Sequence, residues 1–208
     1  MASVRQLHRS EVAASASLLA RAFTADPFLG HFMADPRRRR LALPPFFAAV
    51  LHELIGSKEV YVSEHQGEMV GVAAWVPPEP KPSSRDARLR ARLASMHVRL
   101  LFPRAAPQVR SGFETLGADH PSDPHWYLAF VGIEPEQQGH GLGRQLLGPV
   151  LEQADREHRI CYLETPFPDT RAFYRKLRFA DTAELRPVAG APPIWTMTRE
   201  PHTTPSLG

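Results

Sequence analysis

The sequence of 208 residues contains one cysteine, Cys161, and no run of eighteen apolar residues. A single cysteine excludes a disulfide within the chain and is typical of a reducing compartment. Without a long apolar run, no helix is expected to cross a membrane. The first twelve residues are polar and of mixed charge, unlike a secretory signal. We therefore expect a cytoplasmic protein that does not associate with membranes.

Metal-binding spacings are also missing, although the chain has ten histidines. No His-Glu-x-x-His sequence occurs, and His120 and His125 are the only close pair. Protein zinc sites bring three or four such ligands together at characteristic spacings. We therefore expect no metal, and we interpret the histidines as ordinary surface or core residues. Cys161 lies in an apolar segment with no histidine placed to activate it, which predicts an inert thiol.

The charge balance is weakly basic, with a net charge of +3 at pH 7 and a pI near 9.3. Positive charge concentrates at residues 37–40 and within residues 81–110, where Asp86 is the only acid. Such an excess favours an anionic partner, for example a nucleotide cofactor, a nucleic acid or an acidic surface. Neither cluster is interleaved with aromatic residues on which bases stack, and no nucleic-acid motif accompanies them. Nucleic acid is therefore not an expected partner.

Hydrophobic periodicity divides the chain into strands and helices, without repeats or an internal linker. Strands are predicted over residues 3–8, 59–63, 68–76, 125–133, 160–164, 179–188 and 194–199, and helices over residues 10–23, 41–54, 84–101, 141–156 and 168–177. Residues 1–200 are thus expected to form one mixed α/β domain, and residues 201–208 a flexible tail.

Two stretches in the middle of the chain carry weaker signals. The helix over 84–101 has an apolar stripe, which we expect to pack on the body of the protein rather than on a membrane. The stripe consists of Leu89, Leu93, Met96 and Leu100. Residues 103–124 contain several prolines and glycines and are predicted to be a connector with a short helix at most.

The most informative segment joins a buried strand to an amphipathic helix, and it reads Gln138-Gly139-His140-Gly141-Leu142-Gly143-Arg144. A helix N-terminus offers unpaired N–H groups and the positive end of the helix dipole, which together favour a phosphate. Three alternate glycines keep side chains away from that phosphate. A Rossmann loop would need glycine where Arg144 stands, and a P-loop needs a lysine that is missing here. The segment predicts a phosphate-binding loop, with a purely structural turn as the alternative.

Gln138, Gly141 and Gly143 match the Gln/Arg-x-x-Gly-x-Gly/Ala signature of the GCN5-related N-acetyltransferases, which this chain resembles. The strand ending in residues 131–133 is similar to the strand of that family that splays from its neighbour and pairs with the pantetheine arm of acetyl-CoA. Residues 171–179 resemble the second family signature. The resemblance implies the family fold, a mixed, mostly antiparallel and splayed sheet with helices on both faces, and acetyl-CoA as co-substrate.

The departures from the family pattern lie in the second signature. Arg178 stands where many relatives have glycine, and Phe167 and Thr170 replace asparagines that precede the tyrosine. The resemblance covers residues 125–200 closely, whereas the N-terminal half agrees only in layout. These departures predict a short helix with altered contacts to the thiol end of the cofactor.

Site residues follow from the resemblance. Tyr174 is the implied proton donor to the departing thiolate, with a packed core tyrosine as the alternative, and a main-chain N–H near Val131 is the implied oxyanion donor. Glu164, at the end of the strand beside the splayed one, is a candidate base, with a structural carboxylate as the alternative. Glu134 is a weaker candidate. The residues expected to bind the cofactor are Val131, Gly132, Ile133, Gln138, Gly139, His140, Gly141, Leu142, Gly143, Arg144, Thr170 and Phe173.

The predicted reaction is direct transfer of acetyl from acetyl-CoA to the primary amine of a small molecule, in a ternary complex. Within the family the likeness is greatest to the puromycin N-acetyltransferases, which implies an aromatic or aminoacyl amine and a role in antibiotic resistance. Two alternatives stay open. One is acylation of a protein N-terminus or lysine, and the other is a catalytically silent module that senses acyl-CoA. A monomer and a homodimer fit the sequence equally.

Overall fold

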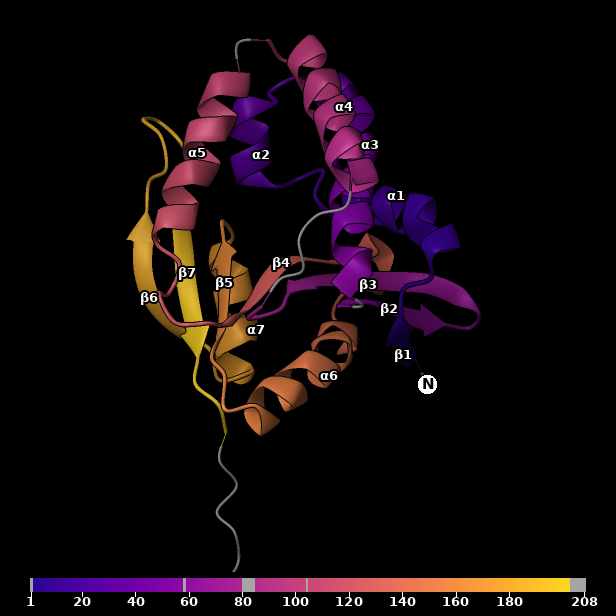
Figure 1. The fold of residues 1–208 in the computed structure, drawn as a ribbon, viewed down its shortest axis with the longest axis vertical. Helices are drawn as coiled ribbons and strands as arrows, with labels where there is room; N and C mark the ends of the chain where they lie inside the picture. The colour runs from indigo at the N-terminus through magenta and orange to yellow at the C-terminus, as the bar shows by residue number, and fades with distance from the viewer. Residues whose placement is uncertain (1, 58, 80–84, 104, 203–208) are drawn as a thin grey trace, which may run out of the picture.

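The computed structural model describes residues 2–57, 59–79, 85–103 and 105–202. In these residues seven strands form one sheet in the order β1-β2-β3-β4-β5-β7-β6 (Figure 1). Neighbouring strands run antiparallel, except that β4 and β5 run parallel. The strands are β1 (Ser3–Gln6), β2 (Val60–His65), β3 (Glu68–Val76), β4 (Trp126–Ile133), β5 (Cys161–Thr165), β6 (Ala180–Leu185) and β7 (Ile194–Arg199).

Helices cover both faces of this sheet, as predicted (Figure 1). Helices α1 to α5 lie on one face, and α6 and α7 lie on the other. They are α1 (Val12–Ala22), α2 (Pro27–Phe32), α3 (Pro36–Leu54), α4 (Arg85–Leu101), α5 (Ala106–Ala118), α6 (Leu142–Arg156) and α7 (Pro168–Lys176), with short 3₁₀ turns η1 (Arg9–Glu11), η2 (Ile55–Ser57) and η3 (Pro135–Gln137). The predicted fold class is confirmed: a mixed, mostly antiparallel sheet between two helical layers.

The central strand β4 changes the face to which its side chains point at a bulge. Consecutive residues Ala74 and Trp75 of β3 pair with Phe130 and Leu128, so Ala129 is the extra residue of the bulge. Leu128 packs in the core under α6, whereas Phe130 packs in the core under α1 and α3. The bulge therefore lets one strand contribute to both cores. It also explains why the sequence of β4 shows no clean alternation.

The helix predicted to follow the arginine run instead contains it. Helix α3 begins at Pro36, and the side chain of Asp35 accepts the N–H groups of Arg37 and Arg38. An aspartate cap followed by proline is a strong start signal for a helix. The same pair at residues 26–27 starts α2, where only a stop was predicted. Because residues 37–40 are all arginines, the apolar periodicity that predicts this helix begins only at Leu41, five residues after its actual start.

The predicted connector over 103–124 contains a helix of thirteen residues, α5. Its proline lies in the first helical turn, where an N–H group would be unpaired in any case. Gly112 lies under the ring of Phe28, where a Cβ atom would come within 3.1 Å of Cζ. These residue types had suggested a loop. The proline instead begins a helix, and Gly112 allows a close packing contact.

The apolar stripe of α4 does not pack on the body, which corrects the prediction. Its four members Leu89, Leu93, Met96 and Leu100 are between 52% and 73% exposed. Helix α4 instead lies on α3 through smaller side chains, including Ala94 and Val98. Small residues at a helix contact let the two backbones approach, so the longer side chains are left on the outer side. Ser84, the predicted first residue of this helix, lies outside the described residues.

No helix in the described ranges is long and apolar enough to cross a membrane. Residues 203–208 of the predicted tail lie outside the described residues. The two residues before them are placed, and the main-chain N–H of His202 donates to Asp155 at 2.6 Å. Asp155 also accepts both terminal nitrogens of Arg199 at 2.7 Å, which ties β7 to α6.

Candidate active site

A gap opens in the sheet between β4 and β5. The two strands pair over three residues only, Trp126–Leu128 with Cys161–Leu163, and then separate. On the other edge of β4 the N–H of Glu134 donates to Val70, and hydrogen bonding in an antiparallel ladder alternates from residue to residue. The main-chain groups of Val131 and Ile133 therefore point away from β3, into the gap. Their carbonyl and N–H groups line it like the edge of an open sheet.

The remaining predicted strand residue, Gly132, faces elsewhere. Its register position directs its main-chain groups to β3, where it pairs with Val72. A Cβ atom at Gly132 would lie 2.9 Å from the Cβ of Ala22 and 3.0 Å from a methyl group of Leu19. The close approach of α1 to the sheet therefore accounts for this glycine.

The glycine loop connects the end of β4 to the N-terminus of α6. Gly139 and Gly141 have φ angles of 83° and 77°, in the left-handed region that other residues rarely adopt. Gly141 is the residue that caps α6, so the first N–H groups of that helix lie at the end of the loop. The side-chain amide of Gln138 donates to the carbonyl of Ile133 at 3.2 Å, which holds the loop against the edge of the gap.

The other loop residues have separate roles. Leu142 is buried, and a Cβ atom at Gly143 would lie 3.1 Å from the ring of Phe173. Gly143 therefore lets α7 pack against the first turn of α6. His140 and Arg144 are exposed; the ring of His140 contacts the carbonyl of Gln137 at 3.3 Å. Within the described residues the guanidinium of Arg144 has no ion pair or hydrogen bond, which leaves it available at the loop.

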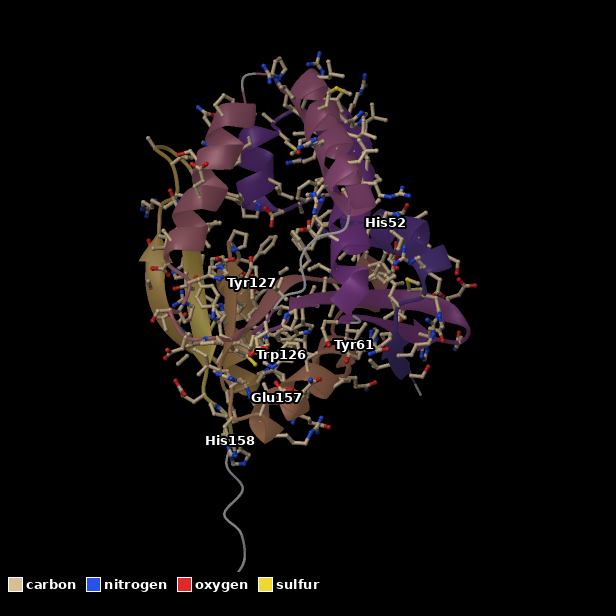
Figure 2. All side chains as sticks on the ribbon, viewed as in Figure 1. His52, Tyr61, Trp126, Tyr127, Glu157 and His158 are labelled. Carbon is tan, nitrogen blue, oxygen red and sulfur yellow. The ribbon has the colours of Figure 1, made fainter. Side chains whose placement is uncertain are left out.

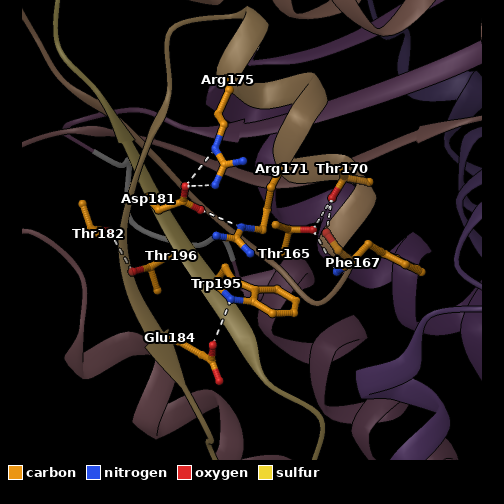
Figure 3. Close-up of polar contacts among 10 residues, drawn as sticks. All are labelled: Thr165, Phe167, Thr170, Arg171, Arg175, Asp181, Thr182, Glu184, Trp195 and Thr196. Atoms are coloured by element: carbon orange, nitrogen blue, oxygen red, sulfur yellow. Dashed lines mark hydrogen bonds and ion pairs between the residues drawn. The ribbon is translucent and has the colours of Figure 1, made fainter.

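Helix α7 follows β5 directly, and hydroxyl groups fix its start (Figure 3). The hydroxyls of Thr165 and Thr170 lie 2.6 Å apart, and that of Thr170 also donates to the carbonyl of Phe167 at 2.9 Å. Thr170, at one of the positions of the family asparagines, thus bonds within the first turn of the helix and does not cap its N–H groups. Tyr174 lies two residues before the end of α7, packs in the core under α6 and is 6% exposed. Burial raises the pKa of Tyr174, which keeps its hydroxyl protonated at neutral pH.

The end of α7 is held by charges and by an unusual backbone conformation. Arg171 and Arg175 both donate to the carboxylate of Asp181 on β6, as Figure 3 shows. Arg178 has a φ angle of 71°, which is the conformation that a glycine at this position adopts without strain. The chain thus keeps the turn of the second signature although its residue differs from the family pattern.

Glu164 lies on the opposite side of the sheet from Tyr174. Its neighbours Cys161 and Leu163 belong to the core under α6, so the alternation of β5 points Glu164 toward the layer of α1 to α5. Tyr127 lies on that same side, and Figure 2 shows it pointing away from α6. The hydroxyl of Tyr127 donates to Oε2 of Glu164 at 2.7 Å. Burial, together with this carboxylate, raises the pKa of Tyr127 well above its usual range, so it remains a donor.

Three further residues near Glu164 were not predicted as part of a site, namely His120, His125 and Tyr162. Nε2 of His120 lies 3.2 Å from Oε1 of Glu164, and the ring of His120 lies between those of Tyr127 and Tyr162, 4.5 Å from each centroid. Nδ1 of His120 lies 3.2 Å from Nε2 of His125. The spacing of the two histidines was visible in the sequence, but nothing there placed them beside Glu164.

Glu134, the weaker candidate base, is occupied by another contact. Arg21 on α1 donates to both of its carboxylate oxygens, with Nε 3.1 Å from Oε2. This bidentate pair closes the corner between α1 and the end of β4. Among the described residues no three His, Cys, Asp or Glu side chains are positioned to hold a metal ion. Glu164, in contrast, directly follows the last residue of β5 that pairs with β4, where the gap begins.

Comparison with known proteins places these features in a family. The model of the acetyltransferase (GNAT) family matches residues 25–179. An uncharacterized N-acetyltransferase of Schizosaccharomyces pombe is 24% identical over 213 residues, spanning 97% of this chain and 84% of that protein. Two solved structures share the fold. One is described as histone acetyltransferase HPA2 and related acetyltransferase from Corynebacterium glutamicum (TM-score 0.71, 22% identity, 98% of each chain), and the other as mosquito arylalkylamine N-acetyltransferase like 5b (TM-score 0.57, 13% identity, 96% and 100%). The chain belongs to the acetyltransferase (GNAT) family.

Proposed function

We propose that this acetyltransferase moves the acetyl group of acetyl-CoA directly to the primary amine of a small acceptor, in a ternary complex. The observation that carries the proposal is the gap between β4 and β5. It has main-chain groups of Val131 and Ile133 along one edge and a glycine loop at one end, while Tyr174 and Glu164 lie on opposite faces of the sheet. These are the groups that an elongated thioester and an amine require on opposite faces of one opening.

The residues present fit acetyl-CoA. Pyrophosphate oxygens would accept from the N–H groups at the start of α6, with Gly139 and Gly141 allowing the close approach and Arg144 adding positive charge. The amides of the pantetheine arm would pair with Val131 and Ile133 as an added strand does. When bound, acetyl-CoA supplies an activated acetyl group as a thioester.

Three groups of the chain act on the reaction in this proposal. Glu164 takes the proton of the acceptor ammonium directly or through water, and its Oε1 accepts no hydrogen bond of good geometry within the described residues. The main-chain N–H of Val131 donates to the oxygen on which negative charge develops. Tyr174 supplies a proton to the departing thiolate.

The acceptor is proposed to be a small aromatic or aminoacyl amine, as for puromycin. The aromatic rings of Tyr127, Tyr162 and His120 surround Glu164, and aromatic rings favour flat apolar groups and cations. An amine-directed acetyltransferase of this specificity would detoxify an antibiotic in the cytoplasm. The cytoplasmic location and the monomer or homodimer stay predictions.

The test is release of free CoA from acetyl-CoA over a panel of amines that includes puromycin, arylalkylamines and a lysine-containing peptide. Tyr174→Phe should lower kcat by about 10²-fold, the ordinary contribution of a general acid, without changing KM for acetyl-CoA. Tyr61→Phe, on the distant strand β2, is the matched control and should behave as the wild type.

Each alternative gives a different result in this assay. Release with the peptide alone would replace the small acceptor by a protein. Acetyl-CoA that raises the melting temperature without release on any amine would indicate a sensor. An unchanged rate in Tyr174→Phe would remove this residue from the mechanism.

A further inference from the structure

A line of polar contacts leads from Glu164 toward the protein surface. Oε1 of Glu164 lies 3.2 Å from Nε2 of His120, and Nδ1 of His120 lies 3.2 Å from Nε2 of His125. Nδ1 of His125 lies 2.8 Å from the main-chain carbonyl oxygen of Asp123. The side chain of Glu164 is 9% exposed and that of His120 is 24% exposed, so the line runs outward.

The chemistry of these contacts assigns the protons on both rings. A carbonyl oxygen only accepts, so Nδ1 of His125 carries the hydrogen of that contact. In a neutral ring, Nε2 of His125 is then an acceptor, and Nδ1 of His120 must donate to it. Nε2 of a neutral His120 consequently presents a lone pair to the carboxylate of Glu164.

One proton is therefore missing between Glu164 and His120. Two acceptors lie 3.2 Å apart there, and no hydrogen bond of good geometry joins them. The other carboxylate oxygen already accepts from Tyr127. A single added proton would convert the unfavourable contact into a charge-assisted hydrogen bond.

We propose that Glu164 and His120 form one shared proton acceptor, and that His125 carries the proton on to solvent. This inference rests on the proposed function. An N–H bond of the acceptor ammonium breaks as its proton binds Oε1 of Glu164, and the neutral amine keeps the electron pair for attack. The proton is then held between Oε1 and Nε2 of His120. As it binds Nε2, the hydrogen on Nδ1 of His120 passes to Nε2 of His125. The Nδ1–H bond of His125 then breaks, and that proton leaves to a water that replaces the carbonyl of Asp123 as its acceptor.

The groups packed around His120 keep this path in place. Tyr127 on β4 and Tyr162 on β5 hold its ring from two sides, and the hydroxyl of Tyr162 lies 3.4 Å from the carboxylate of Asp119. Glu164, His125 and Asp119 are the other titratable groups that face it. Burial, with the carboxylates of Glu164 and Asp119, raises the pKa of Tyr162, so neither tyrosine removes a proton from the path. His120 acts through Glu164 and needs no contact with the acceptor.

The experiment compares His120→Gln and His125→Gln with the wild type in the CoA-release assay, with rates measured across pH. Glutamine keeps a polar atom near the position of Nε2 but does not carry a proton onward. His120→Gln should lower kcat by about 10²-fold while KM for acetyl-CoA is unchanged. The shape of its pH profile should also change, because the variant lacks the imidazole of the pair. His125→Gln should lower kcat by about tenfold, because only the transfer of the proton outward to solvent is removed.

Rescue separates a relay from a structural role. Imidazole in solution should restore part of the rate of His120→Ala, and it should do nothing for Tyr174→Phe. His65→Gln, at the end of β2, serves as the control and should match the wild type. An active wild type with an unchanged pH profile in His120→Gln and no rescue of His120→Ala would overturn the relay and leave the proposed function intact. If the wild type releases no CoA with any amine, the proposed function itself is wrong.

Discussion

Asp26 offers a quantitative test of the buried electrostatics of this fold. It caps helix α2, its carboxylate accepts the N–H of Leu29 at 2.7 Å, and the residue is only 4% exposed. Burial raises the pKa of Asp26 from 3.8 to about 6, although the N–H groups of Leu29 and Phe28 and the charge of Arg39 oppose the change. The folded protein therefore holds a proton on Asp26 more tightly than the unfolded chain does.

The direction of the pH effect follows from this difference. Between about pH 4 and pH 6 the folded state binds more protons than the unfolded state, so the free energy of unfolding falls as pH rises. The full loss for a shift of this size is about 3 kcal/mol, at roughly 1.4 kcal/mol per pKa unit, and it is complete above the folded pKa. Asparagine keeps the oxygen that caps the helix and does not titrate. The free energy of unfolding of Asp26→Asn should therefore rise relative to that of the wild type as pH rises, by about 2.4 kcal/mol between pH 4 and pH 7.5.

Urea unfolding followed by tryptophan fluorescence at several pH values measures this difference directly. The matched control is Asp35→Asn at the cap of α3, where the carboxylate is 47% exposed and stays largely hydrated in the folded protein. A difference between Asp26→Asn and the wild type that stays constant or shrinks with rising pH would refute the reasoning. Such a result would mean that burial does not disfavour the charged form of the Asp26 carboxylate in the folded protein.

Three further predictions concern single contacts. Arg178→Gly should stabilise the protein by about 1 kcal/mol in thermal unfolding, because glycine adopts the φ of 71° without strain, whereas Arg178→Ala should bring no gain. Gly143→Ala should lower stability by about 1 kcal/mol through the contact with Phe173, and adding Phe173→Leu should restore most of it in a double-mutant cycle. Burial raises the pKa of Cys161 to about 12, so a thiol reagent at pH 8 should modify it only after unfolding.

Strong local signals made the C-terminal half of the fold predictable from the sequence. The glycine loop, the apolar strands on either side of it and the short helix before Phe179 appear where they were expected. The α6 core residues Leu142, Leu146 and Val150 are buried as predicted. Here the local period, the turn residues and the tertiary contacts all favour the same structure.

The N-terminal half was less predictable because long-range packing decides there. The direction of the α4 stripe depends on which side of that helix rests on α3, and a periodicity does not specify the partner. The neighbours of Glu164 illustrate the same limit in the site. Tyr127 and Glu164 are 37 residues apart and meet only because β4 and β5 run parallel in one register. His120 joins them from the segment after α5, a helix that was predicted as a connector.

The short junction between β4 and β5 divides the protein into two consecutive segments of chain. Residues 3–156 contain four strands and six helices of the described structure, and residues 161–199 contain the other three strands and α7. Three main-chain residue pairs join the sheet across this boundary. A molecule held in the gap would touch both segments at once, so its binding free energy would also resist their separation. The place where the sheet is least continuous is thus the place where a bound substrate would do most for its cohesion.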